Sequence, residues 1–187
     1  MLNLSRIASR AAGACALALA LLSPVHAAPV LQMSAATSAT GIDLTVRAQD
    51  VTDLYGYQFT LNFDPALLKA IGGTEGSFLS SGGSTFFDPG SIDNIAGSIS
   101  FVFDTLVGAI NGVDGSGDLA TFSFDVLQGG FANFSFSDVF FLDSNFAEIS
   151  IEARSLVAQV PEPATLWLTA IALFAVLGAR TRRARTL

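Results

Sequence analysis

Side chains able to do catalysis are scarce in the central part of this chain, residues 28–160. The segment has neither cysteine nor histidine, which excludes disulfides, thiolate nucleophiles, imidazole bases and nitrogen or sulfur ligands for zinc. Paired carboxylates, as in glycoside hydrolysis, are the catalytic chemistry that remains. Asp43, Asp104 and Asp125 occupy positions predicted to face outward from strands, where a solvated charge is the usual state. We therefore predict no catalytic residue, and a glycan-active hydrolase is the less favoured alternative.

The glycine-rich segment 111–118 carries side-chain oxygens that suit calcium. In an EF-hand, Asp114 before Gly115 would be the fifth position, which makes Ile110 the first and Gly112 the third, and neither of these has a side-chain oxygen. An irregular calcium site that uses backbone oxygens is left open beside the simpler interpretation, a hairpin turn. The acids and amides at positions 88, 93 and 94 are no more specific, so no cofactor and no metal ligand is predicted.

The charge of residues 28–160 is strongly negative. Arg47, Lys69 and Arg154 are its three basic side chains, against 15 acidic ones. Phosphate and sulfate groups would be repelled by such a surface and would release no counterions from it. The composition therefore argues against nucleic acids and anionic glycans as partners.

Apolar residues in this segment recur at every second position, which is the pattern of half-buried strands. The alternation is visible at 42–48, 55–63, 99–103, 122–126, 134–136 and 149–151. Phe101 and Phe103 are predicted to point inward with the other phenylalanines of these segments. Clusters of Gly, Asn, Asp and Ser separate the segments and suit turns. Strands with one apolar face can bury it by stacking two antiparallel sheets, so a β-sandwich with a phenylalanine-rich core is expected.

Two segments resemble strands of the cohesin family. Residues 56–68 read Gly-Tyr-Gln-Phe-Thr-Leu-Asn-Phe-Asp-Pro-Ala-Leu-Leu, similar to the family's G-x-x-F-x-L-x-Y-D-P-x-x-L, and Asp64-Pro65 is expected to end the strand in a short turn. Residues 117–126 resemble the later G-x-L-A-T-x-x-F strand. The resemblance covers about residues 30–159. It implies a noncatalytic jelly-roll sandwich of about eight or nine antiparallel strands that binds dockerin modules through one sheet face.

Polar residues that alternate with the core positions on wet sheet faces are the candidate binding face. The five residues predicted for it are Gln58, Thr60, Asn62, Ser123 and Asp125. The expected partner is a dockerin-like protein or a neutral polysaccharide. A structural protein of the biofilm matrix without a specific ligand is the alternative.

The first 27 residues have the features of a signal peptide. Arg6 and Arg10 precede an apolar run at 11–22, and Val25 and Ala27 supply small side chains at the −3 and −1 positions of a cleavage site. Cleavage after Ala27 would leave a mature chain that begins at Ala28. The domain that follows, 28–160, is long enough for one hydrophobic core.

The C-terminal segment 161–187 combines a motif, an apolar run and a basic cluster. The motif is Pro161-Glu162-Pro163, the uncharged run is 164–179, and the basic residues that follow are Arg180, Arg182, Arg183 and Arg185. Clustered arginines stay on the cytoplasmic side of a membrane. The run would rise about 24 Å as a helix, which is short for a hydrocarbon core of ~30 Å.

This segment resembles the PEP-CTERM sorting tail of Gram-negative bacteria. The resemblance implies a transmembrane helix in an inner-membrane precursor, cleavage near Pro-Glu-Pro by an exosortase, and delivery to the cell surface or the exopolysaccharide matrix. An ordinary C-terminal membrane anchor is the alternative, although it gives no reason for the Pro-Glu-Pro motif.

Overall fold

The computed structural model describes residues 28–37 and 41–161 of the chain. The predicted signal-peptide site and most of the sorting tail lie outside these ranges, namely Ala27, Glu162, Pro163, Arg180, Arg182, Arg183 and Arg185. Within the described ranges no helix is long and apolar enough to cross a membrane.

The described residues form strands and one short helix. In chain order these are β1 (Val30–Thr37), β2 (Gly41–Asn62), β3 (Leu68–Glu75), α2 (Ser77–Ser80), β4 (Thr85–Asp88), β5 (Ser91–Asp93), β6 (Ser98–Leu106), β7 (Val113–Val126), β8 (Gly130–Asp143), β9 (Glu152–Ala153) and β10 (Leu156–Val160). The predicted strand at 149–151 is not regular strand; Ile149 and Ile151 nevertheless pack against the core just before β9.

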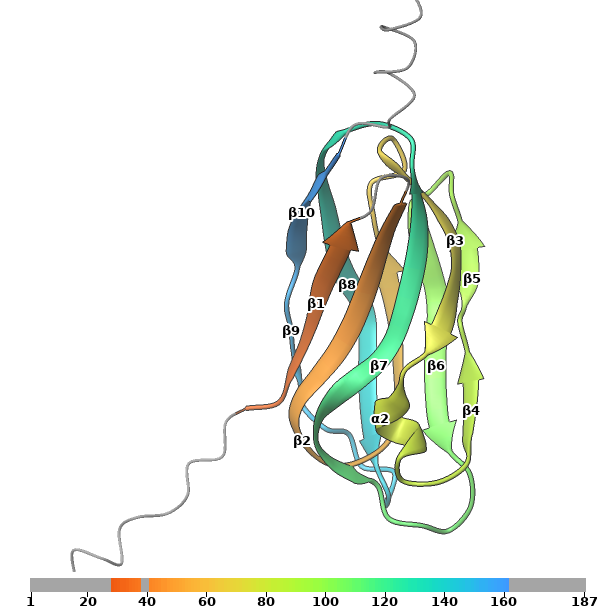
Figure 1. Ribbon diagram of the computed structural model, residues 1–187. Helices are drawn as coiled ribbons and strands as arrows, with labels where there is room; N and C mark the ends of the chain where they lie inside the picture. Colours follow the sequence, from red (N-terminus) through yellow and green to blue (C-terminus); the bar gives the residue numbers. More distant parts are fainter. Residues whose placement is uncertain (1–27, 38–40, 162–187) are drawn as a thin grey trace, which may run out of the picture.

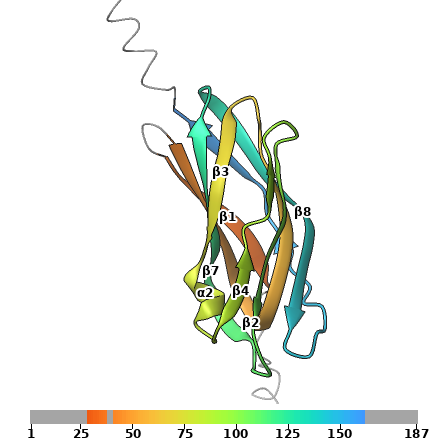
Figure 2. The same cartoon turned by 90° about the vertical axis from the view of Figure 1, so that its right-hand side faces the viewer.

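The strands stack as two layers, seen from the front in Figure 1 and from the side in Figure 2. We call β9–β1–β2–β7–β3 the first sheet, which contains the N-terminal half of β2. The second sheet is β10–β8–β2–β6, with β4 and β5 on the far side of β6 and the C-terminal half of β2 inside it. All pairs are antiparallel except β1 with β9. The predicted all-β jelly-roll sandwich is confirmed.

Strand β2 belongs to both sheets. The sequence pattern predicts two strands, at 42–48 and 55–63, whereas the structure has one continuous strand of 22 residues. The strand bends between the two halves, where Asp50 and Asp53 adopt left-handed φ values of 53° and 55°. Aspartate tolerates this conformation better than most residues. The register with β7 shifts at the same place. The bend thus carries the chain from one layer to the other without a loop.

The core fills the space between the layers with the predicted inward residues. Phe59, Phe122, Phe124 and Phe134 are among its largest fully buried side chains. Phe59 meets Phe122 and Phe124 meets Phe134 edge to face, with ring centroids 6.3 Å and 5.5 Å apart. Such pairs add to the stability that burial itself gives. The predicted phenylalanine core is confirmed for these strands.

The predicted facing of β6 is wrong beyond its first residues. Ile99 is buried as expected, but the next buried residues are Val102 and then Asp104, while Phe101 and Phe103 face solvent. Phe101 has φ of 57°, and the pairing with β2 steps from Ile99 to Val102, which leaves one residue of β6 extra. A β-bulge of this kind reverses the alternation of all later side chains. Asp104 is therefore a core residue and not a solvated one.

The turn after β2 forms as predicted. The Asp64 carboxylate accepts a hydrogen bond from the amide of Ala66 at 3.0 Å, and the Asp64 carbonyl accepts one from Leu68 at 3.0 Å. Leu68 is fully buried at the start of β3. This turn redirects the chain from the second sheet to the edge of the first.

Candidate binding face

The outer surface of the second sheet carries large aromatic side chains, which we call the aromatic face: Phe86, Phe101, Phe103 and Phe140. Phe86, Phe101 and Phe140 are 59%, 67% and 42% exposed, and Phe103 is half-buried between its neighbours. The rings of Phe86 and Phe103 lie 5.8 Å apart. Contiguous exposed apolar surface on one face of a soluble domain is typical of an interaction site.

Strand pairing places Phe86, Phe103 and Phe140 in cross-strand rows, while Phe101, at the bulge of β6, has no paired residue. Gln58 of β2 lies between Phe140 of β8 and Phe103 of β6. In the next row, Gly56 lies between Leu142 and Thr105, and Thr105 in turn pairs with Phe86 of β4. Paired residues in a sheet point to the same side. The aromatic face therefore spans four strands, with the shorter side chains of β2 along its middle.

A shallow hollow of about 250 Å³ lies over the middle of this face. Its lining includes Gly56, Gln58, Phe103, Thr105, Phe140 and Leu142. A methyl group built on Gly56 would lie 3.2 Å from Oγ1 of Thr105, so the glycine leaves the floor of the hollow open. The shape fits one inserted side chain better than a buried small molecule, because such molecules usually occupy about 300 to 1,000 Å³.

Three of the predicted binding residues lie on the outer side of this same sheet. Gln58 is partly exposed in the middle row. Thr60 is mostly covered and pairs with Ser137, and the amide of Asn62 donates a hydrogen bond to Oγ of Ser137 at 3.1 Å. Gln58 is thus the predicted residue that borders the hollow.

The other two predicted residues belong to the opposite side of the molecule. Ser123 and Asp125 lie on β7, which pairs with residues 41–54 of β2 and not with residues 58–62. Oγ of Ser123 donates a hydrogen bond to the carboxylate of Asp43 at 2.7 Å. The five residues do not form one face, because β2 changes sheets between its two halves.

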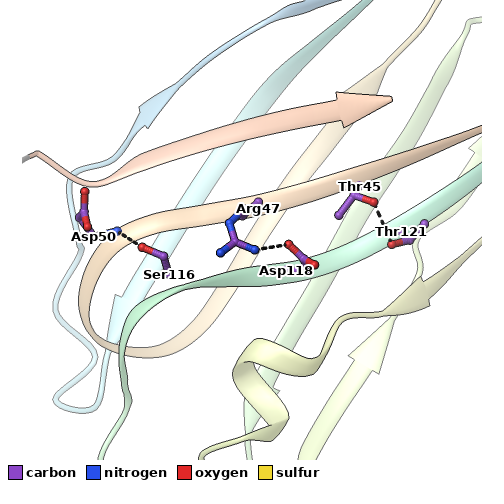
Figure 3. Close-up of polar contacts among 6 residues, drawn as sticks. All are labelled: Thr45, Arg47, Asp50, Ser116, Asp118 and Thr121. Carbon is purple, nitrogen blue, oxygen red and sulfur yellow. Dashed lines mark hydrogen bonds and ion pairs between the residues drawn. The ribbon is translucent and has the colours of Figure 1, made fainter. Parts of the chain in front are cut away.

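The outer face of the first sheet is polar and pairs its own side chains (Figure 3). Nη1 of Arg47 lies 2.7 Å from the carboxylate of Asp118, and the hydroxyls of Thr45 and Thr121 lie 3.4 Å apart. Both contacts join β2 to β7 directly across the sheet. These four side chains therefore already have partners within the domain.

Asp104 is the one charged residue among the buried side chains of the described chain, with 1% of its surface exposed. Neither of its carboxylate oxygens accepts a hydrogen bond of good geometry, although the backbone amide of Thr105 lies close enough to lower the pKa in part. Burial raises the pKa of Asp104 to about 7, and the negative charge of Glu75 raises it as well. Oε1 of Glu75 accepts a hydrogen bond from Thr85 at 2.6 Å. Asp104 can give up a proton near neutral pH, but its carboxyl group points to the core side of β6, away from the aromatic face.

The segments considered for calcium are occupied by contacts within the protein. Asp114 accepts a hydrogen bond from the amide of Asp53, and Asp118 binds Arg47. Asp88 and Asp93 cap the turns that follow them. Among the residues that the structure describes, no group of three or more acidic, histidine or cysteine residues is placed to hold a metal ion.

The aromatic face was not predicted from the sequence, although one signal for it exists. Phe86-Phe87 and Phe140-Phe141 are adjacent pairs within strands, and neighbouring side chains of a strand point to opposite sides. One phenylalanine of each pair must therefore face outward. Phe141 is fully buried and Phe87 packs against the core, which leaves Phe86 and Phe140 outside.

Comparison with protein-family models matches two parts of the chain. Residues 29–155 match the cohesin domain, and residues 159–183 match the PEP-CTERM protein-sorting motif. No curated protein sequence matches the chain. The two sequence resemblances are therefore confirmed, and three residues, 156–158, lie between the matched segments.

Solved cohesin structures share this fold at low sequence identity. A non-cellulosomal cohesin from Archaeoglobus fulgidus aligns with a TM-score of 0.59 at 12% identity over 76% of this chain and 98% of its own. The sixth cohesin of scaffoldin B from Acetivibrio cellulolyticus, solved with a Cel5 dockerin mutant, aligns with a TM-score of 0.58 at 16% identity over 72% of this chain and 100% of its own. A Coh-OlpA–Doc918 cohesin–dockerin complex from Clostridium thermocellum aligns with a TM-score of 0.58 at 15% identity over 72% of this chain and 100% of the matched chain. With a matching family model over more than half of its length and the same sandwich, this chain belongs to the cohesin family.

Proposed function

We propose that this protein is an exported, noncatalytic binding module that captures a dockerin-like protein through its aromatic face. The observation that carries the proposal is the set of phenylalanines Phe86, Phe101, Phe103 and Phe140, exposed or half-exposed on one sheet without a packing role in the core. Two of the similar structures were solved as cohesin–dockerin complexes, which supports this class of partner.

The physical properties of the face suit protein recognition. A few large aromatic side chains near the centre of an interface usually supply most of its binding energy. Here they stand on paired strands, so little conformational entropy is lost when a partner covers them. The hollow over Gly56 offers a place for one partner side chain. Since the domain is acidic, we expect basic residues at the rim of the partner's surface, where they speed association.

Export and sorting form the second part of the proposal. We expect the precursor to pass through the inner membrane and an exosortase to cleave near Pro161, Glu162 and Pro163. The sorting motif begins at residue 159, within β10, whose last residue Val160 is buried against the sandwich. The folded module is thus joined to its sorting tail without a long spacer. We propose the domain boundaries 1–27, 28–160 and 161–187 for this arrangement.

Capture by the immobilised chain tests the binding role. The chain is incubated with the extracellular matrix fraction and with purified dockerin modules, and bound proteins are identified by mass spectrometry. Phe101→Ser with Phe140→Ser should lower dockerin capture at least tenfold, while Thr45→Ala with Thr121→Ala, on the polar face, should leave it unchanged. Both double variants are checked for an unaltered melting temperature. Equal capture by the two would exclude the aromatic face, and no capture at all would favour a structural matrix role.

The sorting role is tested by the intact mass of the surface form. The mature protein is expected to lack the segment after Pro163, and Pro161→Ala with Pro163→Ala should retain full-length precursor in the membrane. Deletion of the exosortase should have the same effect. A surface form that still contains Trp167 and the arginine cluster would instead indicate an ordinary C-terminal anchor.

A further inference from the structure

A second concavity lies at the end of the sandwich where β6 and β8 finish, the lower end in Figure 1. We call it the loop-end pocket. It has a volume of about 540 Å³, within the usual range for small-molecule sites. The residues of interest in its lining are Tyr55, Ile110, Asn111, Ser144, Asn145 and Phe146. The described chain ends beyond β10 at the opposite end of the sandwich, so the pocket points away from the segment that leads to the sorting tail.

The two loops that form the pocket are fixed to each other by Asp53. One carboxylate oxygen accepts a hydrogen bond from the amide of Gly112 at 2.7 Å. The other accepts hydrogen bonds from Oγ and the amide of Ser144 at 2.6 Å and 3.2 Å. The hydrogen bond from Oγ of Ser144 is the main reason why the pKa of Asp53 is lowered. A shared carboxylate therefore holds both loops in one arrangement before any ligand binds.

The pocket presents an aromatic ring to solvent. Phe146 is 70% exposed and has a left-handed φ of 62°, in a turn whose amides at Asn145 and Ala147 donate to the carboxylate of Asp143. Its ring meets that of Tyr55 edge to face at 5.6 Å. The Tyr55 hydroxyl donates to the carbonyl of Gly108 at 2.7 Å, which fixes that ring to the other loop. The turn thus holds Phe146 in a fixed position although its ring does not pack against the core.

Polar groups beside this ring are free to bind a ligand. Within the described residues, neither Asn111 nor Asn145 uses its side-chain amide in a hydrogen bond, and both residues are exposed. An amide offers both donors and acceptors, as a pair of neighbouring hydroxyls requires. The charges close to the loops are negative, at Asp53, Asp114 and Asp143. An anionic ligand would be repelled.

We propose that the loop-end pocket is a binding site for a neutral glycan. The apolar C–H face of a sugar ring would stack on Phe146 beside Tyr55, and its hydroxyl groups would exchange hydrogen bonds with Asn111 and Asn145. The lining of this pocket shares no residue with the hollow on the aromatic face. One module would therefore hold a protein on its side and a polysaccharide at its end.

Affinity electrophoresis of the full-length chain in mild detergent tests the site. The gels contain hydroxyethylcellulose, mixed-linkage β-glucan, galactomannan or dextran, and alginate serves as the anionic control. Retardation is expected with at least one neutral polysaccharide and not with alginate. Phe146→Ala with Asn111→Ala should weaken that binding at least tenfold, whereas Tyr55→Phe, which keeps the ring, should weaken it less than threefold.

The controls separate this site from the aromatic face. Phe101→Ser should leave glycan retardation unchanged, and Phe146→Ala with Asn111→Ala should leave dockerin capture unchanged. Circular dichroism and the melting temperature verify that each variant is folded, and Asn145→Ala alone provides a milder change if the double variant unfolds. No retardation by any of the four neutral polysaccharides, equal retardation by alginate, or full binding by the folded pocket variants would each overturn the proposal.

Discussion

The outer faces of the two sheets differ in how their side chains are partnered. On the first sheet, Arg47 and Asp118 form an ion pair, and Thr45 and Thr121 approach within 3.4 Å. On the second sheet, exposed phenylalanines flank Gln58 and a hollow that no side chain of the domain fills. A face whose polar groups are mutually paired gains little from a partner, while apolar rings left in water gain free energy when they are covered.

Strand β2 contributes residues to the outer faces of both sheets, so its two halves can be compared directly. In residues 41–54 of β2, apolar residues alternate with Asp, Thr and Arg, whose partners on β7 are Ser, Thr and Asp, respectively. In residues 56–62, apolar residues alternate with Gly, Gln, Thr and Asn, and the neighbours of this half on β6 and β8 include Phe103 and Phe140. The chemistry of each face therefore depends both on the outward residues of that half of β2 and on the strands beside it.

The largest expected effect separates buried from exposed phenylalanine. Phe59→Ala should lower the free energy of unfolding by about 3 to 5 kcal/mol, because a large fully buried ring is lost from the core. Phe101→Ala should lower it by less than about 0.5 kcal/mol, since that ring already contacts water. Urea unfolding followed by circular dichroism measures both, with Gln58→Ala as a surface control. A core-sized loss for Phe101 would mean that the aromatic face serves stability and not binding.

The next effect concerns the buried acid of the second sheet. The folded-state pKa of Asp104, about 7, lies above its ordinary value of 3.8. The folded protein therefore holds a proton that the unfolded chain has released, and stability falls as the pH rises from about 4 through 7. Asp104→Asn should remove this dependence and stabilise the protein at pH 8 by about 2 to 4 kcal/mol relative to wild type, with little change at pH 4.

Thermal or urea unfolding from pH 4 to pH 8 measures the Asp104 effect. Asp125→Asn is the matched control, because that residue is exposed on the first sheet and should leave the pH profile unaltered. Parallel profiles for wild type and Asp104→Asn would contradict the assignment of the proton to Asp104.

The smallest effect tests the pairing on the first sheet. The side chains of Arg47 and Asp118 are 40% and 47% exposed, so solvent screens their attraction. A double-mutant cycle with Arg47→Ala and Asp118→Ala should give a coupling energy of about 0.2 to 1 kcal/mol, which decreases in 1 M salt. A coupling above this range and insensitive to salt would show that the polar face contributes more to stability than its exposure implies.

Several features were predictable because they depend on residues close in sequence. Alternation identified the strands that contain Ile42, Phe59 and Phe124, and the Asp64-Pro65 turn formed as expected. The bulge in β6 was not predictable in this way. Nothing in the sequence around Phe101 marks it as an extra residue, and its left-handed φ arises where β6 pairs with β2.

The predicted binding residues illustrate the same limit. Gln58 and Asp125 both point away from the core, but Gln58 lies in the second sheet and Asp125 in the first. The loop-end pocket was missed for a related reason, because Tyr55, Asn111 and Phe146 come from three segments far apart in the chain.

The sequence by itself determined the all-β class, the phenylalanine core, the lack of cysteine and histidine between residues 28 and 160, and the cohesin and sorting-motif resemblances. These follow from composition, from a period of two and from short motifs, all of which are local. Only the tertiary structure decided that Asp104 is buried, that Phe101 and Phe103 point away from the core, and which polar residues share a surface. A period of two specifies that successive side chains alternate, but one bulged residue reverses the phase. The neighbours of β2 on β6, β7 and β8 are fixed by pairing across 36 to 89 residues of chain.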